Sequence, residues 1–257
     1  TSTSQIPHLE ILGLRSHIKA FAGNPVSISS PCLLDRINDD HVDIIFDEQD
    51  PWNPPVDAYV EQHPDVVVIG GPFDDKTRAN YFIISESREK TNEGIFEWNK
   101  AYAALFNKEA ESNAYFDEIV GRYDCISETA AAIATDDKSP VVLWAYYSAY
   151  QKGWDVANCP NYYCEYAAQC SVTMLEDPTG QSLNTLNDTE FMELAKDADI
   201  WIFPSLDWDD IYSANKDMLD QFAAVKNMEV YDYQVPGPHA WFEQRFAEFD
   251  AVMQDFC

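Results

Sequence analysis

Seven short runs rich in Val and Ile, separated by helical patterns, are the feature that most limits how this chain can fold. They lie at Val42–Phe46, Val66–Ile69, Phe82–Ile84, Val141–Trp144, Ser171–Met174, Ile200–Phe203 and Glu229–Asp232. Most are apolar throughout, which is typical of parallel strands that are covered on both faces. Helical patterns such as Thr189–Ala198 and Asp217–Lys226 lie between them. The alternation predicts an α/β protein with mainly parallel sheets.

One segment interrupts this alternation. Residues Glu93–Tyr123 contain no proline, and large apolar residues recur there at steps of three and four, as on one face of a helix. Such a helix would be about 45 Å long, more than a helix that crosses back over a sheet needs. The segment therefore predicts a rigid connecting helix between two lobes, residues 1–92 and 124–257. The alternative is two ordinary helices with a bend near Asn107 or Gly121.

Composition excludes several classes of protein. The 257 residues include 45 Asp and Glu against 16 Lys and Arg, a formal net charge of −29. A surface this negative repels nucleic-acid phosphates and anionic lipid headgroups. Hydrophobic residues make up 46% of the chain, which argues against disorder. No apolar run approaches the roughly 20 residues that span a bilayer, so we expect neither a nucleic-acid partner nor membrane insertion.

The cysteines indicate an oxidising compartment. The six are Cys32, Cys125, Cys159, Cys164, Cys170 and Cys257. The central three have the spacing C-x4-C-x5-C, which matches no common zinc site, so the even count predicts disulfides. Buried free thiols are the alternative. The chain has one glycosylation sequon, at Asn187, and its Thr/Ser-rich start is interpreted as a processed end. We therefore expect a secreted or cell-surface glycoprotein.

The order of the segments carries a resemblance to a known family. The first half contains PDVVVIGG at Pro64–Gly71, ISE at Ile84–Glu86, EWNKAYAALFNKEA at Glu97–Ala110 and FDEIVGRY at Phe116–Tyr123. The second half contains SPVVLW at Ser139–Trp144, ADIWIF at Ala198–Phe203, AVKNMEVY at Ala223–Tyr231 and an aromatic, acidic end at Ala240–Asp255. No single motif is diagnostic, but the ordered set covers nearly the whole chain.

This set resembles the class III, helical-backbone substrate-binding proteins of ABC importers, which capture cobalamin, ferric siderophores, haem or metal ions. The resemblance implies two small α/β lobes joined by one long α-helix, no resident cofactor, and a membrane importer as partner. The first strand of the family has no clear counterpart before His8–Leu14. The cysteines and the sequon are unusual for a bacterial lipoprotein and suggest a secreted eukaryotic relative.

The resemblance implies a ligand cleft between the lobes, and ligands of open α/β sheets bind beyond the carboxyl ends of the strands. The candidate contact residues at these ends are Trp52, Phe73, Asp74, Tyr146, Tyr147, Trp154, Asp207, Trp208, His239 and Trp241. Aromatic rings with a few polar groups suit a bulky, partly apolar ligand. Because the chain is so acidic, a corrinoid or hydroxamate siderophore fits better than an anionic catecholate. The alternative is that several of these aromatics only fill the lobe cores.

Signals for catalysis and for metal binding are weak. The chain lacks G-x-S-x-G, G-x-x-x-x-G-K-[ST], H-E-x-x-H and G-x-G-x-x-G. Of the five histidines only His239 follows a predicted strand, and Asp207 and Asp209 fit a helix start as well as a cation site. We therefore expect a non-catalytic ligand-binding protein without a metal site. A structural or adhesive module of an extracellular assembly is the alternative.

Overall fold

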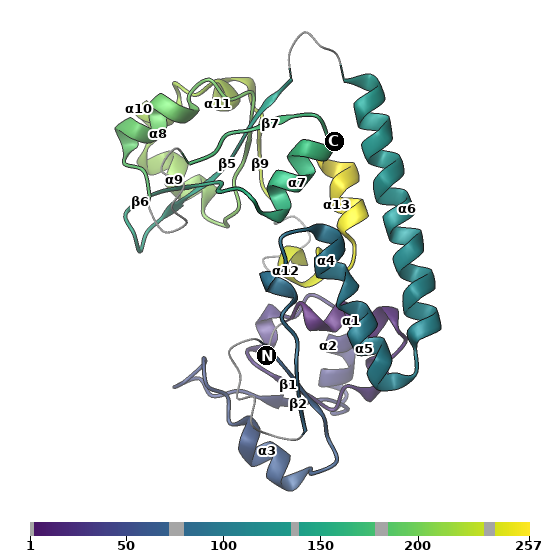
Figure 1. Cartoon of the computed structure of the whole chain (residues 1–257). Coiled ribbons are helices and arrows are strands. Elements are labelled where there is room, and N and C mark those ends of the chain that lie inside the picture. Colours follow the sequence, from purple (N-terminus) through teal and green to yellow (C-terminus); the bar gives the residue numbers. More distant parts are fainter. Residues whose placement is uncertain (1–2, 72–79, 135–138, 178–184, 234–239) are drawn as a thin grey trace. The chain divides into compact units, whose positions relative to one another are not determined.

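The computed structural model of the chain describes residues 3–71, 80–134, 139–177, 185–233 and 240–257 (Figure 1). The chain divides into two compact units. Unit 1 is Thr1–Val120 with Gly237–Phe249, and unit 2 is Gly121–Pro236 with Asp250–Cys257. The predicted second lobe ran from 124 to 257 without interruption, whereas the structure assigns residues 237–249 to unit 1.

Unit 1 is built around two parallel strand pairs, β1–β2 and β3–β4 (Figure 1). Its elements in chain order are α1 (Gln5–Ile11), η1 (Arg15–His17), β1 (Ala20–Ala22), η2 (Pro25–Ser27), α2 (Pro31–Asn38), β2 (Asp43–Ile45), α3 (Val56–Gln62), β3 (Val68–Gly70), β4 (Tyr81–Ile83), η3 (Glu86–Arg88), α4 (Asn92–Glu97), α5 (Asn99–Phe106) and α12 (Ala240–Gln244). One apolar cluster centres on Leu33 under β1 and β2, and another on Ile84 and Tyr102.

Unit 2 is built around one sheet with the strand order β6-β5-β8-β9, and β7 also pairs with β5. Its elements are β5 (Val141–Ser148), β6 (Gly153–Val156), α7 (Tyr162–Gln169), β7 (Thr173–Met174), α8 (Asp188–Ala195), β8 (Ile200–Ile202), α9 (Trp208–Ala214), α10 (Lys216–Leu219), α11 (Ala223–Asn227) and β9 (Val230–Tyr231). Two further helices, α6 (Glu109–Ile133) and α13 (Phe249–Phe256), have residues in both units. Pairings between the described strands of this sheet are parallel except the β5–β6 hairpin, and an isolated bridge between Trp154 and Leu186 is also antiparallel.

The core of unit 2 is a stack of aromatic side chains on one face of this sheet. The ring of Trp154 lies 4.2 Å from that of Phe191 with the planes nearly parallel, and Trp201 and Phe222 pack beside them. Trp201 Nε1 donates to the carbonyl oxygen of Ala145 at 2.9 Å, so its polar atom is satisfied inside the core.

The structure confirms a strand at each of the seven predicted positions. Two further strands, β1 and β6, were not predicted. β1 is the short run Ala-Phe-Ala, which carries no β-branched residue. β6 forms because the chain reverses tightly through Lys152, whose φ is +56°, and pairs back onto β5. Residues 145–148 are therefore strand, although they were predicted as a loop.

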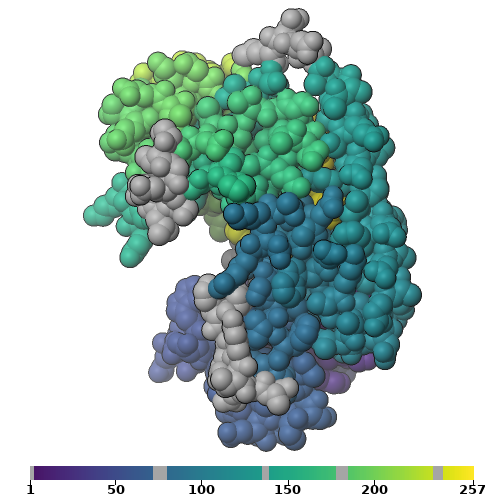
Figure 2. Space-filling view, in the orientation of Figure 1, coloured from purple at the N-terminus to yellow at the C-terminus, as the bar shows by residue number. Residues whose placement is uncertain are grey.

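The prediction of one continuous helix over residues 93–123 is wrong, and the bend near Asn107 that was given as the alternative is present. The structure has α4, α5 and then α6, with the break at Asn107, which adopts a left-handed conformation with φ of +51°. Asparagine tolerates this conformation better than other non-glycine residues and commonly ends helices. The long helix does exist, but it begins at Glu109 and continues to Ile133. Figure 2 shows α6, in teal, at the surface along its length.

A buried polar chain holds this break in place. Ser112 Oγ of α6 donates to Asn99 Oδ1 at 2.6 Å, and Asn99 Nδ2 contacts Nδ1 and the carbonyl oxygen of His8, both at 3.3 Å. The His8 ring stacks on Tyr102 with centroids 5.0 Å apart and is fully buried. Three helices, α1, α5 and α6, are thereby linked through buried side chains, although His8 Nε2 and the Tyr102 hydroxyl have no hydrogen-bond partner among the described residues.

The C-terminal segment is fixed to unit 1 by a carboxylate. Glu243 of α12 is 1% exposed and accepts the backbone N–H groups of Ser29 and Ser30 at 2.6 and 2.8 Å. Ser30 is also the N-cap of α2, and its side chain accepts from Leu33 N. A carboxylate is favourable here because the first N–H groups of a helix lack intrahelical partners.

Two disulfides are present, Cys159–Cys164 and Cys170–Cys257. The prediction that Cys32 and Cys125 are also oxidised is wrong, because both are exposed free thiols. They belong to different units, Cys32 to α2 and Cys125 to α6. Within the described residues, none of the helices combines the length and the apolar character that a membrane span requires.

The burial of His8 predicts acid sensitivity. Desolvation lowers its pKa from 6.5 to about 3, so the unfolded chain binds an additional proton between these values and stability falls as the pH falls. From pH 7 to pH 5 this group alone should reduce the unfolding free energy by about 2 kcal/mol. In chemical denaturation between pH 7 and pH 5, the unfolding free energy of His8→Phe should fall by about 2 kcal/mol less than that of the wild type. The matched exposed variant His41→Phe should keep the wild-type slope, and an equal slope in all three proteins would contradict the assignment.

The cysteine pairing predicts two reactive thiols. Native protein without reductant should titrate with Ellman's reagent to two thiols per chain, because exposed thiols react and disulfides do not. Cys32→Ser and Cys125→Ser should each remove one. A titre of zero would show that these two cysteines are oxidised after all.

Candidate functional site

The carboxyl ends of β1 and β2 border a pocket in unit 1. β1 leads into Gly23 and Asn24, and β2 leads into Phe46 and the loop that ends at α3. Asn24 caps η2, its side chain accepting from Val26 N at 3.1 Å, which fixes the first turn beyond the strand. The pocket has a volume of about 760 Å³, and ligand pockets of drug-sized molecules fall between about 300 and 1,000 Å³.

Trp52 lies on the rim of this pocket. Its side chain is 91% exposed, which is unusual for the largest apolar side chain. The loop that carries it is stiffened by Pro51, Pro54 and Pro55, and Asn53 Nδ2 donates to both carboxylate oxygens of Asp50 at 3.0 and 3.1 Å. An exposed indole on a restrained loop can stack on a ligand at low entropic cost.

The polar groups of the pocket are neutral or acidic. Tyr81 donates its hydroxyl to Asp57 Oδ1 at 3.2 Å, and Asn24, Ser27 and Asn53 complete the polar part of the lining. No Lys, Arg or His is among the described residues that line this pocket. The described lining therefore suits a neutral or cationic ligand.

Unit 2 has an aromatic group on the sheet face opposite its main core. Trp144 of β5 stacks on Tyr163 of α7 at 5.1 Å, and the rings of Tyr162 and Tyr233 both lie 6.2 Å from it. The Cys159–Cys164 disulfide and the cap formed by Asn161 fix the start of α7. The three tyrosines are half-buried, so part of each ring reaches solvent.

Tyr146 and Asp155 form a polar pair beside this aromatic group. The Tyr146 hydroxyl donates to Asp155 Oδ2 at 3.4 Å across the β5–β6 hairpin. Burial, with the neighbouring charge of Asp155, raises the pKa of Tyr146, and burial also raises the pKa of Asp155, to which nearby Asp177 adds. The phenol therefore stays protonated, and because its one proton is donated to Asp155, its oxygen can accept a hydrogen bond from a donor group of a ligand.

Two of the sequence-predicted contact residues belong to the opposite face of the sheet. Trp154 is fully buried, and its Nε1 donates to Asp188 Oδ1 at 2.9 Å. Tyr147 packs edge-on against it with centroids 5.3 Å apart. The expectation that Trp154 contacts a ligand is not supported, since it offers no surface and fills the core of unit 2.

Asp207 and Trp208 start helix α9. The Asp207 carboxylate accepts from Ser205 Oγ at 2.5 Å. The residue occupies the predicted helix start, but its side chain makes no capping hydrogen bond to α9. Trp208 is half-buried and packs edge-on against Trp201 and Phe203. Trp208 therefore covers the core on one side and reaches solvent on the other.

The remaining predicted residues are placed elsewhere or not at all. Trp241 lies in α12 and is half-buried in unit 1, although it was predicted to follow the last strand of the second lobe. Phe73, Asp74 and His239 lie outside the described residues. Asn187 is exposed, and its side chain caps α8 by accepting from Thr189 N and Glu190 N.

Sequence reasoning missed several residues at these edges. Tyr81 and Asp57 line the unit 1 pocket, but they sit at the start of a strand and of a helix rather than at a carboxyl end. Trp144 was counted as an ordinary buried strand residue. The dipeptide Tyr162–Tyr163 next to two cysteines was the available signal for the aromatic group around it.

Within the described residues, no group of three or more His, Cys, Asp or Glu is arranged to hold a metal ion.

Comparison of the sequence with known proteins finds an uncharacterized relative. No family model matches the chain. An uncharacterized lipoprotein of Methanocaldococcus jannaschii is 30% identical over 200 residues, which are 73% of this chain and 46% of that protein, so the chain spans about half the length of this relative.

Solved structures match over almost the whole chain. A possible iron-binding, periplasmic solute-binding protein from Staphylococcus epidermidis has a TM-score of 0.71 at 14% identity, covering 98% of this chain and 93% of its own. The periplasmic haem-binding protein HutB of Vibrio cholerae scores 0.67 at 13% identity, with 98% and 95% covered. FhuD2 from Staphylococcus aureus with bound ferrioxamine B scores 0.65 at 14% identity, with 99% and 93% covered. The fold implied by the sequence resemblance is confirmed: it is that of helical-backbone periplasmic solute-binding proteins.

Truncation of Trp154 and of Trp52 should have different effects on the free energy of unfolding. Trp154→Ala should lower the free energy of unfolding by about 3–5 kcal/mol, because it removes a fully buried ring from the core of unit 2. Trp52→Ala should change it by less than about 0.5 kcal/mol, because the indole is exposed. Urea denaturation of both variants compares them directly. Equal stability of Trp154→Ala and wild type would contradict the described core.

Proposed function

We propose that this chain is a non-catalytic ligand-binding protein that captures a ferric chelate of the hydroxamate siderophore class. The observation that carries the proposal is the exposed Trp52 on the rim of the 760 Å³ pocket at the carboxyl ends of β1 and β2. Structures of the same fold are described as iron-binding, haem-binding and ferrioxamine B-bound. These descriptions support the class of ligand. The residues proposed to contact the ligand are taken from the structure of this chain.

The electrostatics of the chain favour hydroxamates over catecholates. Three hydroxamates neutralise a ferric ion, whereas three catecholates leave the complex strongly negative. The chain has a net charge of −29, and the described lining of the pocket offers one carboxylate and no cation. A negatively charged catecholate complex would be repelled both by the net charge of the chain and by the carboxylate in the pocket. A cobalamin-like corrinoid has comparable bulk and is the competing ligand in the test below.

We assign contact roles at the carboxyl edges of both units. In unit 1, Trp52 supplies apolar area, and Asn24 and Asn53 supply hydrogen bonds. In unit 2, Tyr146 supplies a phenol oxygen that can accept a hydrogen bond, and Asp207 and Trp208 lie beyond the end of β8. We further propose that the protein acts outside the cell, with a membrane importer as partner.

Isothermal titration with ferrioxamine B, a ferric catecholate, hemin and cobalamin tests this function. We expect ferrioxamine B to bind one per chain, and Trp52→Ala to weaken binding by about tenfold or more, since an aromatic anchor of this kind contributes about 1–3 kcal/mol. Tyr150→Ala is the matched control, because that ring is 96% exposed on the β5–β6 turn, outside the pocket.

Three outcomes would contradict the proposal. Tighter binding of the catecholate would remove the electrostatic argument. Preferential binding of cobalamin would assign the corrinoid instead. No binding by any of the four would favour the alternative, a structural module of an extracellular assembly.

A further inference from the structure

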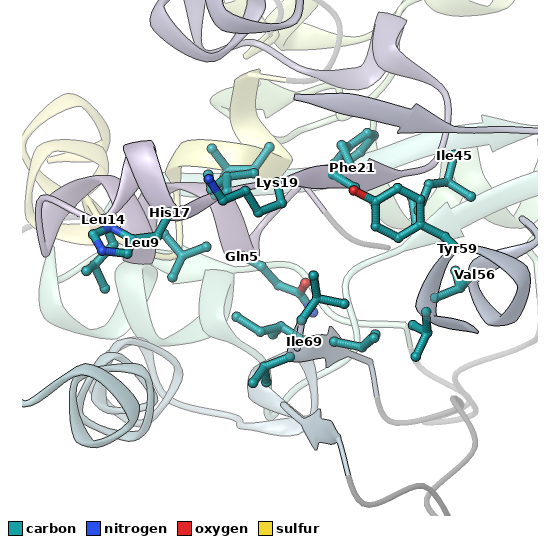
Figure 3. A pocket seen from close by; sticks show the side chains of 18 of the residues that line it. Gln5, Leu9, Leu14, His17, Lys19, Phe21, Ile45, Val56, Tyr59 and Ile69 are labelled. Carbon is teal, nitrogen blue, oxygen red and sulfur yellow. The ribbon is translucent and has the colours of Figure 1, made fainter. Parts of the chain in front are cut away.

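A second cavity lies inside unit 1, next to the chelate pocket and extending from the strand ends toward α1 (Figure 3). It has a volume of about 360 Å³ and is bordered by β1, β3, α1 and α3. In Figure 3, Leu9 and Leu14 lie toward one end, Val56 and Ile45 toward the other, and Gln5 and Ile69 between them. The cavity is therefore long rather than round, and its walls are mostly apolar side chains.

The cavity exists because the two strand pairs of unit 1 do not form one sheet. β1 pairs with β2 and β3 with β4, and no pairing between β1 and β3 occurs in the described structure. Consecutive residues of both segments, Lys19–Ala22 and Asp65–Ile69, line the space between them. An apolar cavity of about 150 Å³ already binds benzene. A space more than twice as large is costly to leave empty, because its walls lose packing contacts.

Gln5 points to the nature of the occupant. Its residue is only 6% exposed and lines the cavity, and no described residue forms a hydrogen bond with its side-chain amide. The amide atoms are not fully enclosed, so they can exchange water in the cavity for a polar atom of a ligand. The amide provides a donor and an acceptor within an otherwise apolar wall.

The charge of the ligand follows from Lys19 and His17. Both side chains border the cavity and reach solvent, and both lie on its Leu14 side in Figure 3. No described acid forms an ion pair with the Lys19 ammonium. A cationic group is conspicuous in a chain with 16 Lys and Arg against 45 acids. Asp65 also lines the cavity, so the case for a negatively charged headgroup depends on Lys19 and His17 at the Leu14 side.

We propose that this cavity binds an aliphatic carboxylate, a fatty acid of medium chain length. The carboxylate accepts hydrogen bonds from the Lys19 ammonium and the Gln5 amide, and the chain lies along the apolar walls toward Val56 and Ile45. The cavity adjoins the chelate pocket, since Ala22, Val56 and Val68 line both, but Lys19 and Gln5 line this cavity alone. The inference does not depend on the proposed function.

Displacement of a dansyl-labelled undecanoic acid from the purified full-length chain tests the proposal. We expect dodecanoate to displace the probe from one site per chain, and dodecylammonium, which has the same chain and the opposite charge, to displace it at least tenfold less well. This comparison is stringent, because nonspecific binding to a chain of charge −29 would favour the cation. Equal displacement by both amphiphiles, or none by dodecanoate, would overturn the proposal.

Variants separate this site from general surface binding. Lys19→Glu should weaken dodecanoate binding at least tenfold, and Gln5→Leu, which keeps the side-chain volume, should weaken it several-fold. Lys196→Glu is the matched control, since Lys196 is exposed in unit 2, and it should bind as the wild type does. Trp52→Ala should also leave dodecanoate binding unchanged. Wild-type affinity in Lys19→Glu would contradict the assigned headgroup site, and displacement of the probe by ferrioxamine B would contradict the separation of the two sites.

Discussion

The buried carboxylate of Glu243 is the contact on which the arrangement of unit 1 depends. It accepts hydrogen bonds from the backbone N–H groups of Ser29 and Ser30. Among the described residues, no other carboxylate bonds to these two groups. Ser30 Oγ in turn donates to Glu10 Oε1 at 2.7 Å, and Arg15 pairs with the same carboxylate. A residue near the C-terminus therefore closes a network that includes α1, η1 and the start of α2. The turn that follows β1, and with it one wall of the chelate pocket, is positioned by the same segment.

The chain passes between the two units three times because of this contact. It leaves unit 1 within α6, returns to it at residue 237 for α12, and enters unit 2 again at Asp250. In unit 2 the end of the chain is secured by the Arg122–Asp250 ion pair, with Nε and Oδ2 2.6 Å apart, and by the Cys170–Cys257 disulfide. Because a disulfide that closes a long loop restricts the unfolded chain, Cys170–Cys257 stabilises the fold more than the five-residue link Cys159–Cys164 on the entropic model.

The aromatic residues divide into two groups with different physical roles. Trp154, Trp201 and Phe191 exclude water from the core of unit 2. The two indole N–H groups are satisfied, Trp201 by the Ala145 carbonyl and Trp154 by Asp188 at the edge of the core. Trp52 and the tyrosines around Trp144 keep part of their rings at the surface, at or near strand ends. Only the second group can exchange contact with solvent for contact with a ligand. This division is why an aromatic-rich composition was informative about the class of ligand but not about which rings bind it.

Local patterns in the sequence were enough to predict the α/β class and the seven strands, because apolar runs and helical periods reflect burial of nearby residues. The helical-backbone fold was implied by the resemblance that the ordered segments carry. Local patterns also predicted Trp52 correctly as a loop residue following β2. They failed where distant segments decide the outcome: the left-handed turn at Asn107, the continuation of β5 into a hairpin, the core position of Trp154, the return of α12 to unit 1, and the free state of Cys32 and Cys125. Each of these depends on which surfaces meet after folding. The sequence determines the local conformational preference of each residue. Which surfaces each residue contacts is decided only when the helices and strands pack together in the tertiary structure.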